Sequence, residues 1–162
     1  MSTIDKQIDI SIVIPVFNEV SLIDELYSRL KLVCEGLGRN YEIIFVDDDS
    51  SDRTVDIINQ LRDKYDNVFL IKRYDKRGLS SALITGALSS NSNYILFMDA
   101  DLQHPPKKIL ELYNEIKAKD IDYVNLHGTA SHLNDKYENK GVYQLFSDKT
   151  PSSSIKGWTG HT

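Results

Sequence analysis

Phe97-Met98-Asp99-Ala100-Asp101-Leu102-Gln103-His104-Pro105 is the stretch that decides how this chain is interpreted. The apolar run that leads into it, residues 94–98, is typical of a buried strand, and it ends in two carboxylates one residue apart. Because side chains alternate along a strand, Asp99 and Asp101 can point the same way while Ala100 points away. Two such groups form a hard-oxygen site suited to Mg²⁺ or Mn²⁺. An ordinary pair of turn aspartates at a strand exit is the alternative.

Outward from this stretch, short apolar runs alternate with helical patterns. Strands are predicted at residues 10–16, 41–46, 68–71 and 94–98, and helices at residues 20–37, 54–65, 79–88 and 106–119. Repeated strand–helix units with short connections predict an α/β fold, in which helices cover both faces of a mostly parallel sheet as three αβα layers. Ligands of such sheets bind at the carboxyl ends of the strands.

Composition limits the class of protein. The 162 residues are enough for one domain with a buried core. A net charge of −5 and the lack of a basic stripe argue against a nucleic-acid partner. Cys34 is the only cysteine, which excludes a disulfide within the chain and a cysteine-based zinc site. The first residues are unlike a signal peptide, and no apolar stretch approaches the roughly 20 residues that span a bilayer. We therefore expect a cytoplasmic protein, with peripheral membrane contact left open.

Polar side chains follow three of the predicted strands. They are Asn18 and Glu19 after the first strand, Asp47, Asp48 and Asp49 after the second, and Asp99, Asp101 and Gln103 after the fourth. Carboxylates gathered at one edge repel one another unless a cation or hydrogen-bond donors are present. An aspartate accepts hydrogen bonds from base imino groups and ribose hydroxyls, so Asp47 or Asp48 suits a nucleoside. A diphosphate would then reach from there to a metal at Asp99 and Asp101.

Three ordered motifs resemble those of family 2 glycosyltransferases, and most closely the dolichyl- or polyprenyl-phosphate sugar transferases. They are Ile14-Pro15-Val16-Phe17-Asn18-Glu19, Val46-Asp47-Asp48-Asp49-Ser50-Ser51-Asp52-Arg53-Thr54 and Asp99-Ala100-Asp101-Leu102-Gln103-His104-Pro105. The segment from Arg73 to Gly86 resembles the same branch, and the resemblance covers residues 8–122. Asp49 departs from the pattern, because that family commonly has glycine there and an aspartate has less backbone freedom at a turn.

The resemblance implies the nucleotide-binding half of a GT-A domain, which is Rossmann-like. The nucleoside would be held by Pro15, Phe17, Glu19, Asp47 and Asp48, the last two on base and ribose, and the metal by Asp99, Asp101 and Gln103. Asp99 and Asp101 would be the catalytic residues, since bound Mg²⁺ or Mn²⁺ neutralises the leaving diphosphate as a Lewis acid. The implied donor is a GDP- or UDP-linked sugar. The implied acceptor is a polyprenyl phosphate at a membrane surface, or another glycan or lipid.

Several of these residues also have a purely structural interpretation. Glu19 would favour a helix N-terminus, Asp52 would cap the following helix, Phe17 would pack in the core, and Arg77 would be a solvated surface charge.

Residues 123–162 differ in character, being polar with one plausible strand at 123–126 and one weak helix at 134–146. They resemble the C-terminal part of thiolase-like β-ketoacyl-acyl carrier protein synthases. His127, Lys156 and His161 match the positions of that family's catalytic histidines and lysine. We therefore expect a chimeric chain with a junction near Asp122, in which a truncated glycosyltransferase domain (1–122) precedes a ketosynthase-like fragment (123–162). An unrelated natural extension is the alternative.

A chimera of this kind affects the expected activity. The family's acceptor half would be missing, so sugar transfer would be impaired and exposed apolar surface would favour self-association. Ketosynthase chemistry is not expected, because the nucleophilic cysteine elbow is absent from this chain. Two other functions stay open: a nucleotide-binding remnant without transfer activity, and a ketosynthase-derived fragment that contacts an acyl carrier protein.

Overall fold

The computed structural model of this protein describes residues 7–75, 78–103, 105–118, 124–125 and 152–153. The strands are β1 (Ile10–Val16), β2 (Tyr41–Asp47), β3 (Val68–Lys72), β4 (Tyr94–Phe97), β5 (Val124–Asn125) and β6 (Ser152–Ser153). The helices are α1 (Ile23–Leu37), α2 (Thr54–Lys64), α3 (Leu79–Ser89) and α4 (Lys108–Ala118). β5 and β6 form a separate parallel pair.

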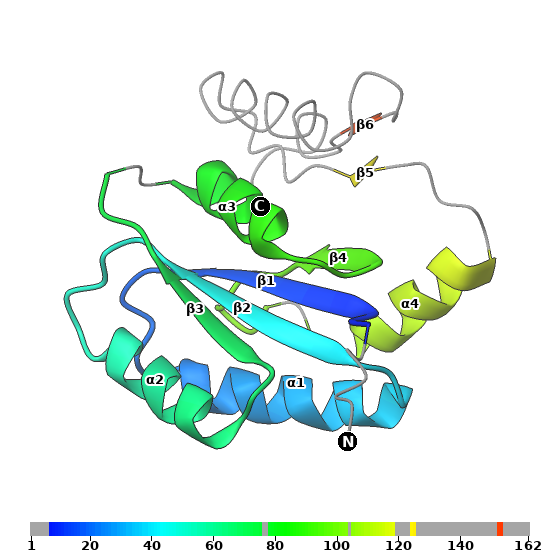
Figure 1. Ribbon diagram of the computed structural model, residues 1–162, viewed down its shortest axis with the longest axis horizontal. Helices are drawn as coiled ribbons and strands as arrows, with labels where there is room; N and C mark the ends of the chain where they lie inside the picture. The colour runs from blue at the N-terminus through cyan, green and yellow to red at the C-terminus, as the bar shows by residue number, and fades with distance from the viewer. Residues whose placement is uncertain (1–6, 76–77, 104, 119–123, 126–151, 154–162) are drawn as a thin grey trace, which may run out of the picture.

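Four parallel strands in the order β3-β2-β1-β4 make up the main sheet. Helices α1 and α2 cover one face and α3 covers the other (Figure 1), while α4 packs beside α1. The central strands β1 and β2 are buried almost throughout, as expected for a parallel sheet covered on both sides. The predicted α/β architecture and its four main strands are confirmed.

Side chains alternate between two cores along the strands. On β1, Ile12 and Ile14 join the large core against α1, α2 and α4, whereas Val13 joins a smaller core under α3. Helix α3 approaches β1 closely because Gly86 has no side chain: an added Cβ would lie 2.3 Å from Val13 Cγ1. The small residues of α3 therefore set the spacing of this layer.

The ends of several elements differ from the sequence prediction. Helix α1 begins at Ile23 instead of residue 20, because Asn18 has a positive φ and the amide of Val20 donates to a side chain of the next loop. Helix α4 begins at Lys108 instead of residue 106, because Pro105 and Pro106 form the turn before it. The weak helix predicted at residues 134–146 lies outside the described residues.

The membrane and packing predictions are tested only in part. Within the ranges given above, none of the helices combines the length and the apolar character that crossing a bilayer requires. Most of the segment after Asp122, where poor packing was expected, lies outside the described residues.

Candidate functional site

Three loops meet at the carboxyl edge of the sheet, because β2, β1 and β4 are neighbours and point the same way. Each loop contains one non-glycine residue with a positive φ: Asn18 (57°), Asp49 (65°) and Leu102 (61°). These are the only such residues in the described part of the chain. Asparagine and aspartate enter this left-handed region at modest cost, whereas leucine is strained there. Strained backbone of this kind gathers at functional sites, so it marks this edge independently of the carboxylates.

The loop after β1 is tied to the loop after β2 by Asn18. Its amide donates to Ser50 Oγ at 2.9 Å, and its Oδ1 accepts from the amides of Ser51 at 2.8 Å and Asp52 at 3.3 Å. The amide of Glu19 adds a bond to Thr54 Oγ1 at 2.8 Å. The sequence prediction gave Asn18 no separate role, although its tolerance of positive φ was a usable signal.

Asp52 completes this tie between the loops. Its Oδ1 accepts from the amide of Thr54 at 2.8 Å, the first residue of α2, and its Oδ2 accepts from the amide of Val20 at 3.2 Å. Burial alone would raise the pKa of Asp52, but hydrogen bonds from Thr54 and Val20 outweigh it and lower the pKa. Asp52 therefore supports the start of α2, although the N-cap of that helix is Arg53 and not Asp52 as expected, and it also fixes the loop before α1.

Asp47 lies at the end of β2 with none of its surface exposed. Its Oδ2 accepts from the amides of Asp49 and Ser50, each at 3.1 Å. Its Oδ1 is buried and has no hydrogen-bond partner. A buried carboxylate oxygen without a donor is costly, so this atom is the most unusual polar feature of the edge.

Asp48 differs from its neighbour, because both of its oxygens are bound by the chain itself. Arg73 Nε donates to Oδ1 at 2.6 Å, Arg73 Nη2 contacts the same oxygen, and the amide of Gly78 donates to Oδ2 at 2.8 Å. The Arg73 side chain is 8% exposed. The sequence analysis gave Arg73 no individual role, although an arginine directly after a strand of this edge was a possible signal.

The carboxylates predicted to bind metal lie on one tight turn after β4. Asp101 Oδ1 accepts from the amide of Gln103 at 3.0 Å, around the strained Leu102. Asp99 is half-buried, and Asp101 and Gln103 are exposed. Within the described residues there is no group of three or more His, Cys, Asp or Glu arranged to hold a metal ion.

Glu19 connects the first loop electrostatically to the fourth-strand turn. Burial raises the pKa of Glu19, and the negative charges of Asp101 and Asp52 raise it further. The carboxylates of the loops after β1 and β4 therefore repel one another.

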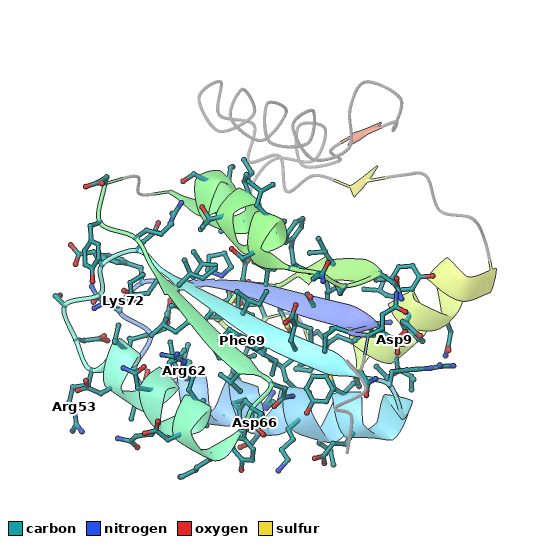
Figure 2. The ribbon with its side chains drawn as sticks, viewed as in Figure 1. Asp9, Arg53, Arg62, Asp66, Phe69 and Lys72 are labelled. Atoms are coloured by element: carbon teal, nitrogen blue, oxygen red, sulfur yellow. The ribbon has the colours of Figure 1, made fainter. Side chains whose placement is uncertain are left out.

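Lys72, at the end of β3, is a cation at the same edge. Its pKa is raised by a hydrogen bond to Tyr74 and by the charges of Asp47 and Asp49. Figure 2 shows Lys72 and Arg53 towards the end of the sheet where these loops lie, and Asp9 towards the opposite end.

The remaining predicted residues fall into two groups. Pro15 is half-buried on β1, and Phe17 is 51% exposed, so the alternative that Phe17 packs in the core is wrong. Arg77, His104, His127, Lys156 and His161 lie outside the described residues.

The comparisons with known proteins agree with this fold. The model of glycosyl transferase family 2 matches residues 11–156. A dolichol-phosphate mannosyltransferase from Pyrococcus furiosus is 45% identical over 108 residues, which are 67% of this chain and 30% of that protein. An undecaprenyl-phosphate 4-deoxy-4-formamido-L-arabinose transferase from Edwardsiella ictaluri is 36% identical over 118 residues, 70% of this chain and 34% of that protein.

A solved structure shares the architecture. It is a mannosyltransferase from Pyrobaculum calidifontis in complex with GDP-Man and Mn²⁺, with a TM-score of 0.58 and 20% identity. The similarity covers 72% of this chain and 34% of that one. The chain therefore has the fold of GT-A glycosyltransferases and spans about a third of the length of the curated relatives just described.

The family match also bears on the predicted junction near Asp122. It continues across that position to residue 156, and it lends no support to a ketosynthase origin of residues 123–162. The boundary between two domains at this position stays a prediction. With its motifs, its parallel sheet and a match over most of its length, the chain belongs to glycosyl transferase family 2.

Proposed function

We propose that this chain binds a GDP- or UDP-linked sugar at the carboxyl edge of its sheet and provides the donor side of a metal-dependent sugar transfer. The observation that carries the proposal is the buried, unpartnered Oδ1 of Asp47. Two loop amides hold the other oxygen, so the carboxylate cannot turn to satisfy both. The imino N–H of guanine or uracil is a donor of the kind that this oxygen lacks, and it would reach the atom once the groups that cover Asp47 move aside, since Asp47 has no exposed surface here. Both bases offer such a group, so both remain candidates.

The neighbouring side chains suit the rest of a nucleoside. The ring of Phe17 is half exposed directly after β1 and offers a flat apolar face, next to Pro15 and Glu19 on the same segment. Asp48 follows Asp47 at the same edge, and both of its oxygens are bound by Arg73 and the amide of Gly78. The left-handed positions Asn18 and Asp49 shape the loops that carry these groups.

Asp99, Asp101 and Gln103 fit a divalent metal. Carboxylate and amide oxygens are the donors that Mg²⁺ and Mn²⁺ prefer. Burial raises the pKa of Glu19 most, and the charges of Asp101 and Asp52 add to it; a cation bound nearby would oppose the effect of these charges. A metal held there would neutralise the leaving diphosphate. Asp99 and Asp101 are accordingly the proposed catalytic residues.

The proposed acceptor is a polyprenyl phosphate, which implies peripheral contact with a membrane surface. The support is the names of the relatives, a dolichol-phosphate mannosyltransferase and an undecaprenyl-phosphate sugar transferase. The donor and metal are supported by the Pyrobaculum enzyme, which was solved with GDP-Man and Mn²⁺. Self-association and the absence of a nucleic-acid partner stay predictions.

A second candidate function is nucleotide binding without transfer. Transfer requires an acceptor held in line with the sugar, and correct positioning is worth several kcal/mol of barrier. Incubation with radiolabelled donor and a short polyprenyl phosphate separates the two, since only the first function releases labelled lipid.

The donor proposal is tested by calorimetry with GDP and UDP, with Mn²⁺ and with EDTA. We expect binding only with metal, and a loss of about 1–3 kcal/mol in Asp47→Asn, whose amide group would present N–H donors to the base instead of an acceptor. Asp66→Asn is the matched control, because Asp66 is exposed on the turn before β3. Equal affinity in EDTA, or an Asp47→Asn variant that binds like the wild type, would contradict the proposal.

A further inference from the structure

Arg73 connects three segments at the carboxyl edge of the sheet, where the nucleotide site is proposed. Its Nε and Nη2 donate to Asp48 Oδ1, its Nη1 donates to Ser81 Oγ at 2.8 Å, and its Nη2 also donates to the carbonyl of Gly78 at 3.1 Å. Ser81 belongs to the first turn of α3, and Gly78 immediately precedes that helix. The end of β2 and the start of α3 are therefore joined through one side chain.

The backbone of Arg73 also binds Asp47, the residue before Asp48. Its amide donates to the carbonyl of Asp47 at 2.8 Å, while the amide of Asp48 donates to Val16 at the end of β1. The two aspartates are thus bracketed, Asp47 by the backbone and Asp48 by the side chain of one residue. A shift of Arg73 would move the Asp47 carboxylate that the proposed function assigns to the base.

The guanidinium is buried, so its contacts hold firmly. Arg73 is 8% exposed and the side chain of Asp48 is 13% exposed. A charge pair out of water is screened little by salt, and removing one partner leaves an uncompensated charge. Gly78 adds a constraint of its own, because its φ of 129° is open to glycine and rarely to other residues.

We propose that Arg73 is a positioning residue of the donor site, which fixes Asp47, Asp48 and the first turn of α3 relative to one another, and that Asp48 acts on the nucleotide through Arg73 rather than by direct contact. The inference rests on the proposed function for its effect on nucleotide binding. Its structural part, the attachment of α3 to Asp48, is independent of any ligand.

An arginine suits this role and a lysine does not. The three donors used here leave a planar group in different directions and reach a carboxylate, a hydroxyl and a carbonyl at once. A lysine keeps the charge but can place its ammonium group at only one of these points. The Arg73→Lys variant therefore separates the effect of charge from that of position.

The experiment combines a double-mutant cycle with hydrogen exchange. The variants are Arg73→Gln, Asp48→Asn, their double variant and Arg73→Lys, with Arg62→Gln as control, because Arg62 is exposed on α2 and bonds only to the nearby Asn59 among the contacts described. Affinity for GDP and UDP with Mn²⁺ is measured by calorimetry. Exchange of the amides in residues 78–89 is measured without nucleotide, and thermal unfolding confirms that each variant folds.

We expect Arg73→Gln and Asp48→Asn each to weaken nucleotide binding about tenfold. The double variant should bind no more weakly than the single variant with the lower affinity. Arg73→Lys should lie between the wild type and Arg73→Gln. Both single variants should speed up exchange in the first turn of α3. The double variant should melt at or above the temperature of Asp48→Asn, since it no longer buries an unpaired charge.

Each other result overturns the inference in a defined way. Unchanged exchange in Arg73→Gln would show that Arg73 does not hold α3. Faster exchange with unchanged affinity would remove its role in the donor site. Losses that multiply in the double variant would show that Asp48 contacts the nucleotide directly. If the wild type binds neither GDP nor UDP, the proposed function fails, and the exchange data alone decide whether Arg73 holds α3.

Discussion

Each end of β2 buries a carboxylate, and the two carboxylates differ in their hydrogen bonds. Glu42, near the start of β2 and 9% exposed, accepts a hydrogen bond from Ser11 Oγ, which accepts in turn from Ser90 Oγ at 2.6 Å. Glu42 has no buried side-chain oxygen without a partner, whereas Asp47 at the other end has one. Burial of a carboxylate therefore does not by itself indicate a binding site. Under the proposed function, the unfilled hydrogen bond is what distinguishes Asp47 from Glu42, because a ligand would supply the missing donor.

A second buried polar atom provides a comparison with Asp47. The hydroxyl of Tyr27, a buried residue of α1, also lacks a partner. Burial raises the pKa of Tyr27 further above its ordinary value, so the group stays neutral. An unpartnered neutral hydroxyl costs less than an unpartnered carboxylate oxygen, and no strained loop surrounds it. The comparison between Glu42 and Asp47 is therefore the informative one.

The largest effect expected from this comparison is on stability. Glu42→Ala removes the charged acceptor of the buried Ser11 hydroxyl, so we expect a loss of about 3 kcal/mol in the free energy of unfolding, measured with urea. Nucleotide affinity should be unchanged. Glu25→Ala is the control, since Glu25 is exposed on α1 and its ion pair with Arg29 is worth little. A Glu42→Ala variant of normal stability that failed to bind nucleotide would contradict this comparison, because it would assign binding to the Glu42 end of β2.

The next effect concerns the metal proposed to bind at the carboxyl edge. Asp101→Asn should weaken metal-dependent binding of GDP or UDP by about 1–3 kcal/mol, because a charged ligand of the cation is lost. The free energy of unfolding should change little, since Asp101 is exposed and its bond to the Gln103 amide can be made by an asparagine oxygen. Calorimetry with and without Mn²⁺ measures the first and urea unfolding the second. A variant that binds with unchanged metal dependence would place the metal elsewhere.

A smaller effect is expected from the strained loop after β2. Asp49 has a φ of 65°, which glycine adopts more readily, so Asp49→Gly should change the free energy of unfolding by less than about 1 kcal/mol. Relief of strain favours the folded state, and the greater freedom of the unfolded glycine opposes it. Ser50→Gly, at a position without positive φ, gains no relief of strain and also removes the hydroxyl that accepts from the Asn18 amide, so it should destabilise more. If Asp49→Gly lost more unfolding free energy in urea than Ser50→Gly, the left-handed conformation of Asp49 would not be strained.

The smallest effect is a local response to acid. Hydrogen bonds from Thr54 and Val20 outweigh burial and lower the pKa of Asp52 below its ordinary value of 3.8. The stabilisation is therefore complete above that value and is lost as pH falls through the lowered pKa. Exchange of the Val20 and Thr54 amides, corrected for its intrinsic pH dependence, should rise at the acid end, while amides around Ser11 and Glu42 stay protected. Asp52→Asn should remove this response. If exchange of the two amides still rises at low pH in Asp52→Asn, another titrating group causes the response.

Much of the fold follows from patterns that act locally. Apolar runs with β-branched residues predicted all four main strands, and their alternation with helical periodicity predicted a parallel sheet with helices on both faces. That topology in turn predicted which residues share an edge: Glu19, Asp47 and Asp101 belong to three loops that meet because β2, β1 and β4 are neighbours. The motifs also predicted the family, since their order and residue types are properties of the sequence itself.

The same local reasoning failed where a residue's partner lies in another loop. Residues 20–22 continue the apolar pattern of α1, yet Asp52 binds the amide of Val20 and the helix starts later. Asp47 and Asp48 look equivalent as neighbours, but only the fold brings Arg73 and Gly78 to Asp48 and leaves one oxygen of Asp47 alone. Sequence determines which groups can bond, whereas the tertiary structure decides which of them meet, because a hydrogen bond depends on distances between segments that no local pattern specifies.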